Sequence, residues 1–255
     1  MLNAMANPGF VDAFSDTARR YASARPSYPA SLFEFIAELA PARHGAWDCG
    51  TGNGQAALGL AALFDTVQAS DASAQQIEHA LPHPRVHYRV AAAEASGLAD
   101  SSVDLISVAQ ALHWFDLPKF YAEARRVARP GGLLAAYGYS WFYVSAPLDP
   151  LIDRWLLRPI EAYWRPNLKW LWHAYRTIDF PFEEISAPRL AIHLDWNLDQ
   201  LLSYCVTWSA TRSKIAAEGN RFLVDAHQAL AAAWGDPQQS RSVVMPISAR
   251  LGRLL

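Results

Sequence analysis

Between residues 30 and 140, apolar runs of strand length alternate with longer helix-like segments. This order is typical of repeated strand-helix-strand units, which fold into a parallel sheet. The runs are almost continuously apolar, as strands covered by helices on both faces require. We therefore predict a doubly wound α/β fold around a mostly parallel, seven-stranded sheet. The predicted core strands are 45–49, 66–71, 86–90, 103–109 and 132–139, and the predicted crossover helices are 55–64, 74–81 and 117–128.

After residue 140 the character of the sequence changes, because eight of the ten tryptophans follow that point. We interpret residues 141–188 as an aromatic-rich helical insertion that caps the substrate site. Two further strands and two helices are predicted after it, and an antiparallel pair of strands would complete the sheet. Pro246 lacks an N–H group, which favours an edge position for the last strand. The late strands are 190–196 and 242–248, the helices are 198–208 and 220–234, and the expected divisions are 1–140, 141–188 and 189–255.

Charge and cysteine content narrow the classes of function. The chain has 22 basic and 24 acidic side chains, a formal charge of -2, which is a poor electrostatic footprint for nucleic acid. Cys49 and Cys205 are far apart and lack metal-ligand spacing, so we expect no metal site and a reducing cytoplasm. The longest uncharged run, 130–148, contains glycines and prolines and is shorter than the roughly 20 residues that span a bilayer. No secretory leader is apparent at the N-terminus, so no membrane partner is expected.

A glycine-rich turn follows the first predicted strand in the stretch AWDCGTGNGQ, residues 46–55. Such a turn exposes backbone N–H groups to the polar tail of a ligand, although a purely structural turn is an alternative. In the dinucleotide fingerprint G-x-G-x-x-G, the third glycine would fall on Gln55. Asp48 on the preceding strand would repel a pyrophosphate but suits a ligand with a cationic group. The turn therefore favours a cationic ligand over NAD(P).

Three more loops follow neighbouring strands. Asp71 ends the second strand, where a carboxylate can bind both ribose hydroxyls or can cap the next helix. Ala93 and Glu94 follow the third strand and could border an adenine, and the segment AQALHWFD follows the fourth. The carboxyl ends of parallel strands meet at one edge of the sheet, which is where open α/β sheets bind ligands.

With these motifs together, the sequence resembles the class I S-adenosylmethionine-dependent methyltransferases, in particular the methyltransferase type 11 group of trans-aconitate methyltransferase-like proteins. The resemblance covers residues 14–140 and implies a Rossmann-like fold with helices on both faces, S-adenosylmethionine as cofactor and S-adenosylhomocysteine as product. The matching stretches are YASARPSYP at 21–29, DCGTGNG at 48–54, SDAS at 70–73, AAAE at 91–94, SVDLISVAQALHWFD at 102–116 and VARPGG at 127–132.

The resemblance also implies roles for single residues. The glycines would lie against the methionine portion with Asp48 and Gln110, the ribose would lie at Asp71 and Ala72, and a lid of about residues 10–30 would close over the site. The loop after the third strand, VAAAEAS, departs from the glycine or aspartate of many relatives, which puts the role of Glu94 in question. The implied cofactor-binding residues are Tyr21, Arg25, Asp48, Gly50, Gly52, Gly54, Asp71, Ala72, Ala93, Glu94 and Gln110.

The acceptor is expected to be a small molecule, with carboxylic acids among the candidates, bound by a monomer or homodimer. His113 is either a general base or a packing residue beside the cofactor. A non-catalytic cofactor-binding module and an NAD(P)-dependent oxidoreductase are the alternative functions. The expected substrate-binding residues are Tyr28, His113, Trp114, Tyr139, Trp141, Trp208 and Arg212.

Overall fold

The computed structural model describes residues 26–254, and its central feature is an eight-stranded sheet. The strand order is β3-β2-β1-β4-β5-β8-β6, and β7 pairs with β8. Strands β1 to β5 are parallel, and β8 runs antiparallel to both β5 and β6. The strands are β1 Gly45–Cys49, β2 Thr66–Asp71, β3 Val86–Val90, β4 Val103–Ala109, β5 Ala128–Tyr139, β6 Glu183–Ile185, β7 Leu190–Trp196 and β8 Arg241–Arg253.

The predicted Rossmann-like, mostly parallel fold is confirmed, with one strand more than the seven expected. The extra strand, β6, has three residues, too few to produce an alternating or continuous apolar pattern. The edge position predicted for the last strand is wrong, because β8 has partners on both sides. Its register with β5 starts at Ile247, so Pro246 lies just before the segment in which its missing N–H would break that ladder.

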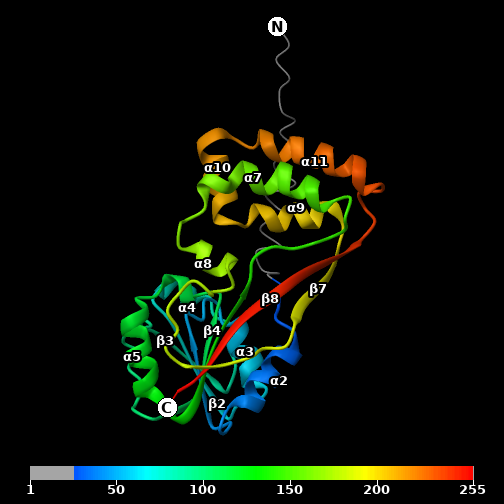
Figure 1. Cartoon of the computed structure of the whole chain (residues 1–255). Coiled ribbons are helices and arrows are strands. Elements are labelled where there is room, and N and C mark those ends of the chain that lie inside the picture. Colours follow the sequence, from blue (N-terminus) through cyan, green and yellow to red (C-terminus); the bar gives the residue numbers. More distant parts are fainter. Residues whose placement is uncertain (1–25, 255) are drawn as a thin grey trace. The chain divides into compact units, whose positions relative to one another are not determined.

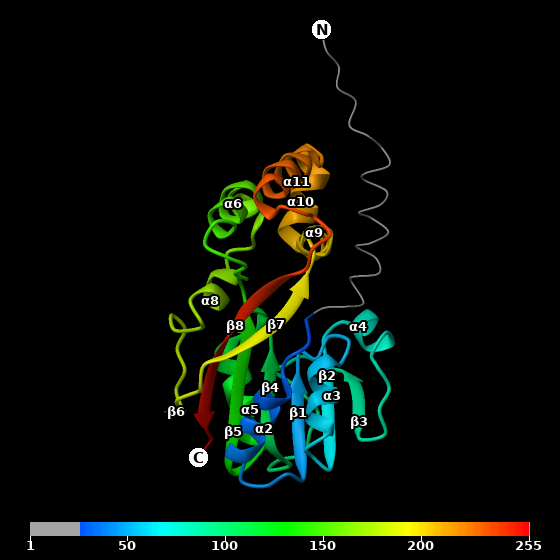
Figure 2. The same cartoon turned by 90° about the vertical axis from the view of Figure 1, so that its right-hand side faces the viewer.

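Helices cover both faces of the parallel part of the sheet (Figures 1 and 2). Helices α2 and α3 lie on one face and α5 lies on the other. Asp116 caps α5 by accepting from the Lys119 N–H, and Pro118 occupies its first turn, where its missing N–H costs nothing. The helices and short turns of this part are α2 Ala30–Leu39, α3 Gln55–Ala61, α4 Ala74–Glu78, η1 Leu112–Trp114, α5 Leu117–Val127 and α8 Leu168–Trp172.

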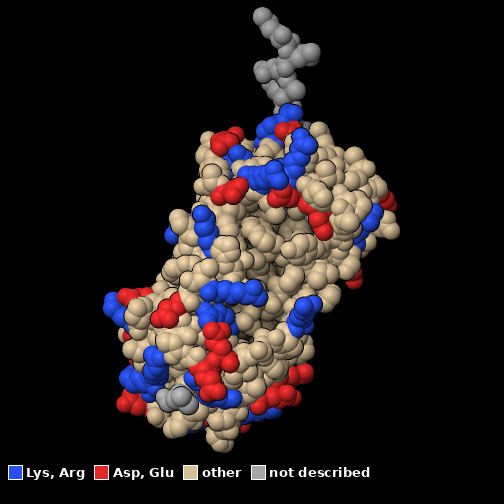
Figure 3. All heavy atoms as spheres, in the orientation of Figure 1, with Lys and Arg blue, Asp and Glu red and all other residues tan. Residues whose placement is uncertain are grey.

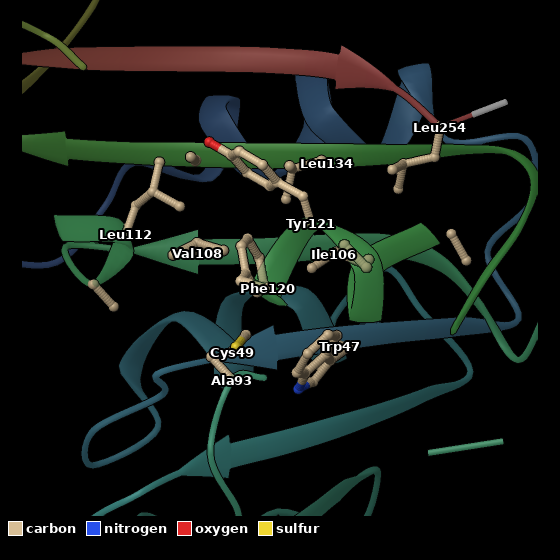
Figure 4. Packing of buried hydrophobic residues seen from close by; sticks show 14 of the residues in the cluster. Trp47, Cys49, Ala93, Ile106, Val108, Leu112, Phe120, Tyr121, Leu134 and Leu254 are labelled. Atoms are coloured by element: carbon tan, nitrogen blue, oxygen red, sulfur yellow. The ribbon is translucent and has the colours of Figure 1, made fainter. Parts of the chain in front are cut away.

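The two faces carry separate apolar clusters, which fix the sheet between them. Figure 4 shows the cluster on the α5 face, in which Phe120 packs beside Trp47 and Val108. Trp47 is fully buried, and its indole N–H donates to the Ser70 hydroxyl at 2.9 Å. The strands read as continuous apolar runs because alternate side chains enter the two clusters. In strand β4, Ile106 belongs to the α5 cluster and Leu105 to the cluster under α2 and α3.

The described chain divides into two compact units, which are considered separately. The core unit contains residues 27–141, 167–192 and 246–254, and the helical unit contains residues 142–166 and 193–245. In the helical unit, a capping box between Asn197 and Gln200 starts α9. The cap function assigned to residues 141–188 stays a prediction. The helical segments of this unit are α6 Asp149–Ile152, η2 Asp153–Leu157, α7 Arg158–Ile160, η3 Glu161–Tyr163, α9 Leu198–Val206, α10 Ser209–Glu218 and α11 Arg221–Trp234.

The order of the strands locates the ligand edge of the core unit. From β1 the chain passes outward to β2 and β3 and then returns to place β4 on the other side of β1. In open α/β sheets this change of direction leaves a crevice at the carboxyl ends of the two central strands. The glycine turn follows β1 and the segment containing His113 follows β4, so both stand at this point.

Candidate functional site

The glycine turn after β1 is held open by positive backbone angles at all three glycines, with φ of 71°, 57° and 91° at Gly50, Gly52 and Gly54. A Cβ on Gly50 would lie 2.5 Å from Cβ of Ala111, and one on Gly54 would lie 2.1 Å from Oη of Tyr88. A Cβ on Gly52 would meet only one side-chain oxygen, at 3.8 Å. Gly50 is therefore required by its contact with an atom fixed to the backbone, Gly54 is crowded by the end of the Tyr88 side chain, and Gly52 is the one of the three with room for a Cβ.

Asp71 joins the turn after β1 to the turn after β2. The Gly50 N–H donates to the Ser70 carbonyl at 2.8 Å, which fixes the start of the turn. One carboxylate oxygen of Asp71 accepts from the Gly52 N–H at 2.9 Å, and the other accepts from the Ser73 N–H at 2.8 Å. Each oxygen keeps a further lone pair for another donor. The cap of α4 is the Ser73 hydroxyl, so capping does not account for Asp71.

Asp48 is fully buried, and its carboxylate is held by two hydroxyl groups. Thr51 donates to it at 2.5 Å and Ser107 at 3.1 Å, and the Ser107 hydroxyl also bonds to the Tyr137 hydroxyl at 2.8 Å. Burial raises the pKa of Asp48 to about 6, because desolvation outweighs the hydrogen bonds that lower it. Asp48 thus fixes the turn through its hydrogen bond with Thr51. Its carboxylate is negatively charged above about pH 6.

The side chain of Glu94, whose role the sequence left open, links the loop after β3 to the loop after β4. Glu94 accepts from the backbone N–H of Asp116 at 2.8 Å through Oε1. Ala93 is buried within the α5 cluster, and Ala72, beside Asp71, is exposed. The structure therefore brings the predicted adenine and ribose positions to the same edge of the sheet, while the adenine and ribose contacts themselves stay predictions.

Gln110, the residue just after β4, adopts a left-handed conformation with φ of 57°. Its side-chain amide donates to the Tyr139 carbonyl at 2.8 Å. A Cβ on Gly138 would come within 2.7 Å of the amide oxygen of Gln110. The glycine in β5 therefore makes the room in which Gln110 turns the chain out of β4, consistent with a backbone contact to the cofactor at this point.

His113 lies in η1 and is buried, with 4% of its surface exposed. Its Nδ1 lies 3.1 Å from Oη of Tyr175, and its carbonyl accepts from the Asn167 side chain at 2.7 Å. Burial lowers the pKa of His113 to about 4, so the ring is neutral at pH 7 and is a weak base. Its neighbour Trp114 points outward, with 52% of its surface exposed.

An aromatic group gathers at the carboxyl end of β5. The Tyr28 ring meets the rings of Tyr137 and Tyr139 edge-on, with centroids 4.9 and 5.7 Å apart. The Tyr28 hydroxyl is buried and has no hydrogen-bond partner among the described residues. Trp141 packs against Trp172 of α8, with centroids 5.2 Å apart. Tyr28 and Tyr139 thus stand together, and Trp141 follows two residues after Tyr139, all three in the core unit.

Four other predicted residues lie outside the described part of the core unit. Trp208 and Arg212 belong to the helical unit, where Trp208 packs against Phe142 and Arg212 is exposed. Tyr21 and Arg25 lie outside the described residues. The roles assigned to all four stay predictions.

Three residues of the site were missed from the sequence. Thr51 lies three residues after Asp48 inside the glycine turn, and Ser107 is a polar residue within an apolar strand, so both gave a signal that could have been read. Tyr175 gave none, because it is separated from His113 by 62 residues and lies in no recognisable motif.

Arg250 supports the segment that carries Tyr175. Its guanidinium donates to the carbonyls of Tyr175 and Ile178 at 2.8 and 3.0 Å, lies 4.4 Å from the centre of the Phe180 ring, and pairs with Glu184. We expect Arg250→Met to lower the free energy of unfolding by about 2–4 kcal/mol, because it leaves two carbonyls without their donors. Urea unfolding measures this.

The control for Arg250 is Glu184→Gln, which removes only the ion pair. The Glu184 side chain is 54% exposed, so we expect a loss of less than about 1 kcal/mol. An equal loss in both variants would mean that the ion pair, and not the bonds to the two carbonyls, stabilises the segment.

In the described residues we found no metal-binding cluster and no membrane-spanning helix, and the charges on one face are mixed. Residues 26–254 contain no group of three or more His, Cys, Asp or Glu side chains placed to hold a metal ion. Within the same residues, no helix is long and apolar enough to cross a bilayer. On the face shown in Figure 3, basic and acidic side chains are interspersed.

The comparisons with known proteins agree on one activity. A family model described as a methyltransferase domain matches residues 47–136. The chain is similar to a protein of Dictyostelium discoideum named as a methyltransferase, with 32% identity over 229 residues that cover 88% of this chain and 87% of the relative. It is also similar to an uncharacterized methyltransferase of Mycobacterium tuberculosis, with 29% identity over 236 residues, covering 86% and 88% of the two chains.

One solved structure is similar over nearly its whole length. This protein of Anaeromyxobacter dehalogenans, described as a type II methyltransferase, is 46% identical, with a TM-score of 0.86 over 91% of this chain and 98% of that chain. The similarity extends through both units of the chain, well beyond the segment that the family model matches.

Proposed function

The chain belongs to the class I S-adenosylmethionine-dependent methyltransferases, and from this premise we propose that it methylates a small-molecule acceptor. The observation that carries the proposal is the pair of turns joined by Asp71. Gly52, where a Cβ would make only one contact, lies beside a carboxylate that keeps lone pairs for two hydroxyl donors. This arrangement fits the amino-acid tail and the ribose of S-adenosylmethionine.

The chemistry of methyl transfer separates what the cofactor supplies from what the residues of the chain must do. S-adenosylmethionine, when bound, supplies an electrophilic methyl group on a sulfonium. The residues of the chain need only hold the two reactants in line and exclude water. Gly52 and Asp71 would hold the cofactor, Asp48 would supply a negative charge near its cationic end, and Gln110 would direct the chain around it.

The aromatic group at the end of β5 supports a small, planar or apolar acceptor. Tyr28, Tyr139 and Trp141 would form its walls, since aromatic side chains with few polar groups are typical of small-molecule sites. Carboxylic acids are included among the proposed acceptors. The near-neutral charge of the chain favours a metabolite over nucleic acid.

Asp71→Asn tests the cofactor site directly. We expect the affinity for S-adenosylhomocysteine to fall by roughly 10–100-fold, because hydrogen bonds to a charged acceptor contribute about 1.5–3 kcal/mol. Isothermal titration calorimetry measures this. The control is Asp65→Asn, which removes an exposed carboxylate at the other end of the same strand and should leave the affinity unchanged.

The acceptor is found by a thermal-shift and turnover screen of acids and phenols on the protein saturated with cofactor. Formation of a methylated product from a small molecule supports the proposal. Tight binding of S-adenosylhomocysteine without turnover of any small acceptor would count against it and favour a macromolecular acceptor.

A further inference from the structure

The ring of His113 and the hydroxyl of Tyr175 form an isolated polar pair inside the core unit. Tyr175 is fully buried, and Nδ1 of His113 at 3.1 Å is the only hydrogen-bond partner of its hydroxyl among the described residues. The other ring nitrogen, Nε2, makes no hydrogen bond within the described chain, and it is not among the buried side-chain atoms that lack a partner. Nε2 therefore accounts for part of the small exposed surface of His113.

The proton between the two residues can be placed by comparing the two possible arrangements. If Nδ1–H donated to the tyrosine oxygen, the phenolic proton would be buried with no acceptor, which is unfavourable. If Tyr175 donates to Nδ1, its proton is satisfied and the ring proton lies on Nε2, which is the accessible atom. Burial also raises the pKa of the Tyr175 hydroxyl, so it keeps its proton.

From this balance we propose that His113 is a hydrogen-bond donor to the bound acceptor through Nε2–H, oriented by Tyr175, and not a general base. The inference rests on the proposed function and assigns a role to one residue of that site. Tyr175 is a positioning residue, since it reaches the acceptor only through His113.

The turn that carries Tyr175 is consistent with such a role. Ala174 and Tyr175 have φ of 55° and 56°, two successive left-handed residues without glycine. Residues other than glycine are strained in this conformation, and the conformation persists only where the surroundings impose it. Arg250 holds the Tyr175 carbonyl, and the Tyr175 N–H donates to the Trp170 carbonyl at 2.7 Å. Strain of this kind gathers at functional sites, where it fixes a side chain in one position.

The assignment restricts the acceptor. With no proton accepted by His113, the assignment favours an acceptor whose attacking atom already carries a free lone pair, as an oxygen anion does. Its lone pair forms the new bond to the methyl carbon, and the electrons of the broken carbon-sulfur bond go to sulfur. Nε2–H can then donate to an oxygen of the acceptor that does not attack.

The tautomer is observable without knowing the acceptor. Full-length protein labelled with ¹⁵N-histidine is studied at pH 7 by NMR correlation between ring nitrogens and ring protons, and His113→Gln identifies the signal of His113. We expect the neutral Nε2–H tautomer in the wild type and a mixture of tautomers in Tyr175→Phe. A neutral Nδ1–H ring, or a doubly protonated ring, in the wild type would overturn the assignment.

Two substitutions separate a donor from a base once turnover is measured. A glutamine amide can place an N–H near the position of Nε2 but cannot accept a proton from the acceptor. We expect His113→Gln to keep kcat within roughly tenfold of the wild type, and His113→Ala to lose on the order of 100-fold. Equal losses in both variants would contradict the donor role. Calorimetry with S-adenosylhomocysteine on each variant shows separately whether the cofactor site itself is intact.

Discussion

Gly50→Ala is expected to lower the free energy of unfolding of the core unit by roughly 2–5 kcal/mol. Part of the loss arises because an alanine at φ of 71° is strained. The rest arises because the new Cβ would lie 2.5 Å from Cβ of Ala111, an atom fixed to the backbone that cannot rotate away. Urea unfolding measures the change, and S-adenosylhomocysteine binding should be lost with it, because the turn must move.

Gly52→Ala is the matched control, because it places the same side chain in the same turn at a similar backbone angle. Its Cβ meets only one side-chain oxygen, at 3.8 Å, so we expect a loss of stability of about 1–2 kcal/mol from backbone strain alone. Its effect on S-adenosylhomocysteine affinity should nevertheless be large, because this is the glycine proposed to lie against the cofactor.

The double variant Gly50→Ala/Ala111→Gly removes the atom that causes the clash. We expect it to be more stable than the sum of its two single changes by about 1–3 kcal/mol, a coupling that only residues in contact show. Additive effects would mean that the strain at Gly50, and not the contact with Ala111, makes the glycine necessary.

The same turn shows what a sequence can and cannot reveal about such a site. The first four core strands were predicted with the bounds that the structure has, because each is a run of strand length that stands between turn residues. The order of strands, turns and helices along the chain was therefore enough to predict the fold and the edge of the sheet at which the candidate site lies. The reason for each glycine was not predictable, since Ala111 and Tyr88 approach the turn from distant segments.

The sequence was least informative about residues that act through a partner distant along the chain. His113 was recognised by its position after β4, but whether it was a base depended on Tyr175 and on burial, neither of which leaves a local pattern. The position of Asp48 beside the turn is evident from the sequence itself. That its carboxylate is fully buried under Thr51 and Ser107 required the three-dimensional structure.

Asp48→Asn is expected to stabilise the protein at high pH. The pKa of Asp48 in the fold, about 6, lies above its unfolded value of 3.8, so folding favours the protonated carboxyl. The stability contributed by this group is therefore fully present below about pH 4 and is lost as the pH rises through 6. Asparagine cannot ionise and avoids that loss. Relative to the wild type, the free energy of unfolding of the variant should rise by about 2 kcal/mol between pH 4 and pH 8.

The measurement is urea unfolding of both proteins at pH 4, 6 and 8, with Asp65→Asn, an exposed carboxylate, as the control expected to show a constant difference. A constant difference between Asp48→Asn and the wild type would show that Asp48 is ionised in the fold throughout this range, and the burial argument would fail.

Calorimetry at pH 8 completes the test. If the buried charge is retained for the cationic end of the cofactor, Asp48→Asn should bind S-adenosylhomocysteine roughly tenfold more weakly while being the more stable protein. An unchanged affinity for S-adenosylhomocysteine would mean that Asp48 only holds Thr51 in the turn and does not bind the cofactor.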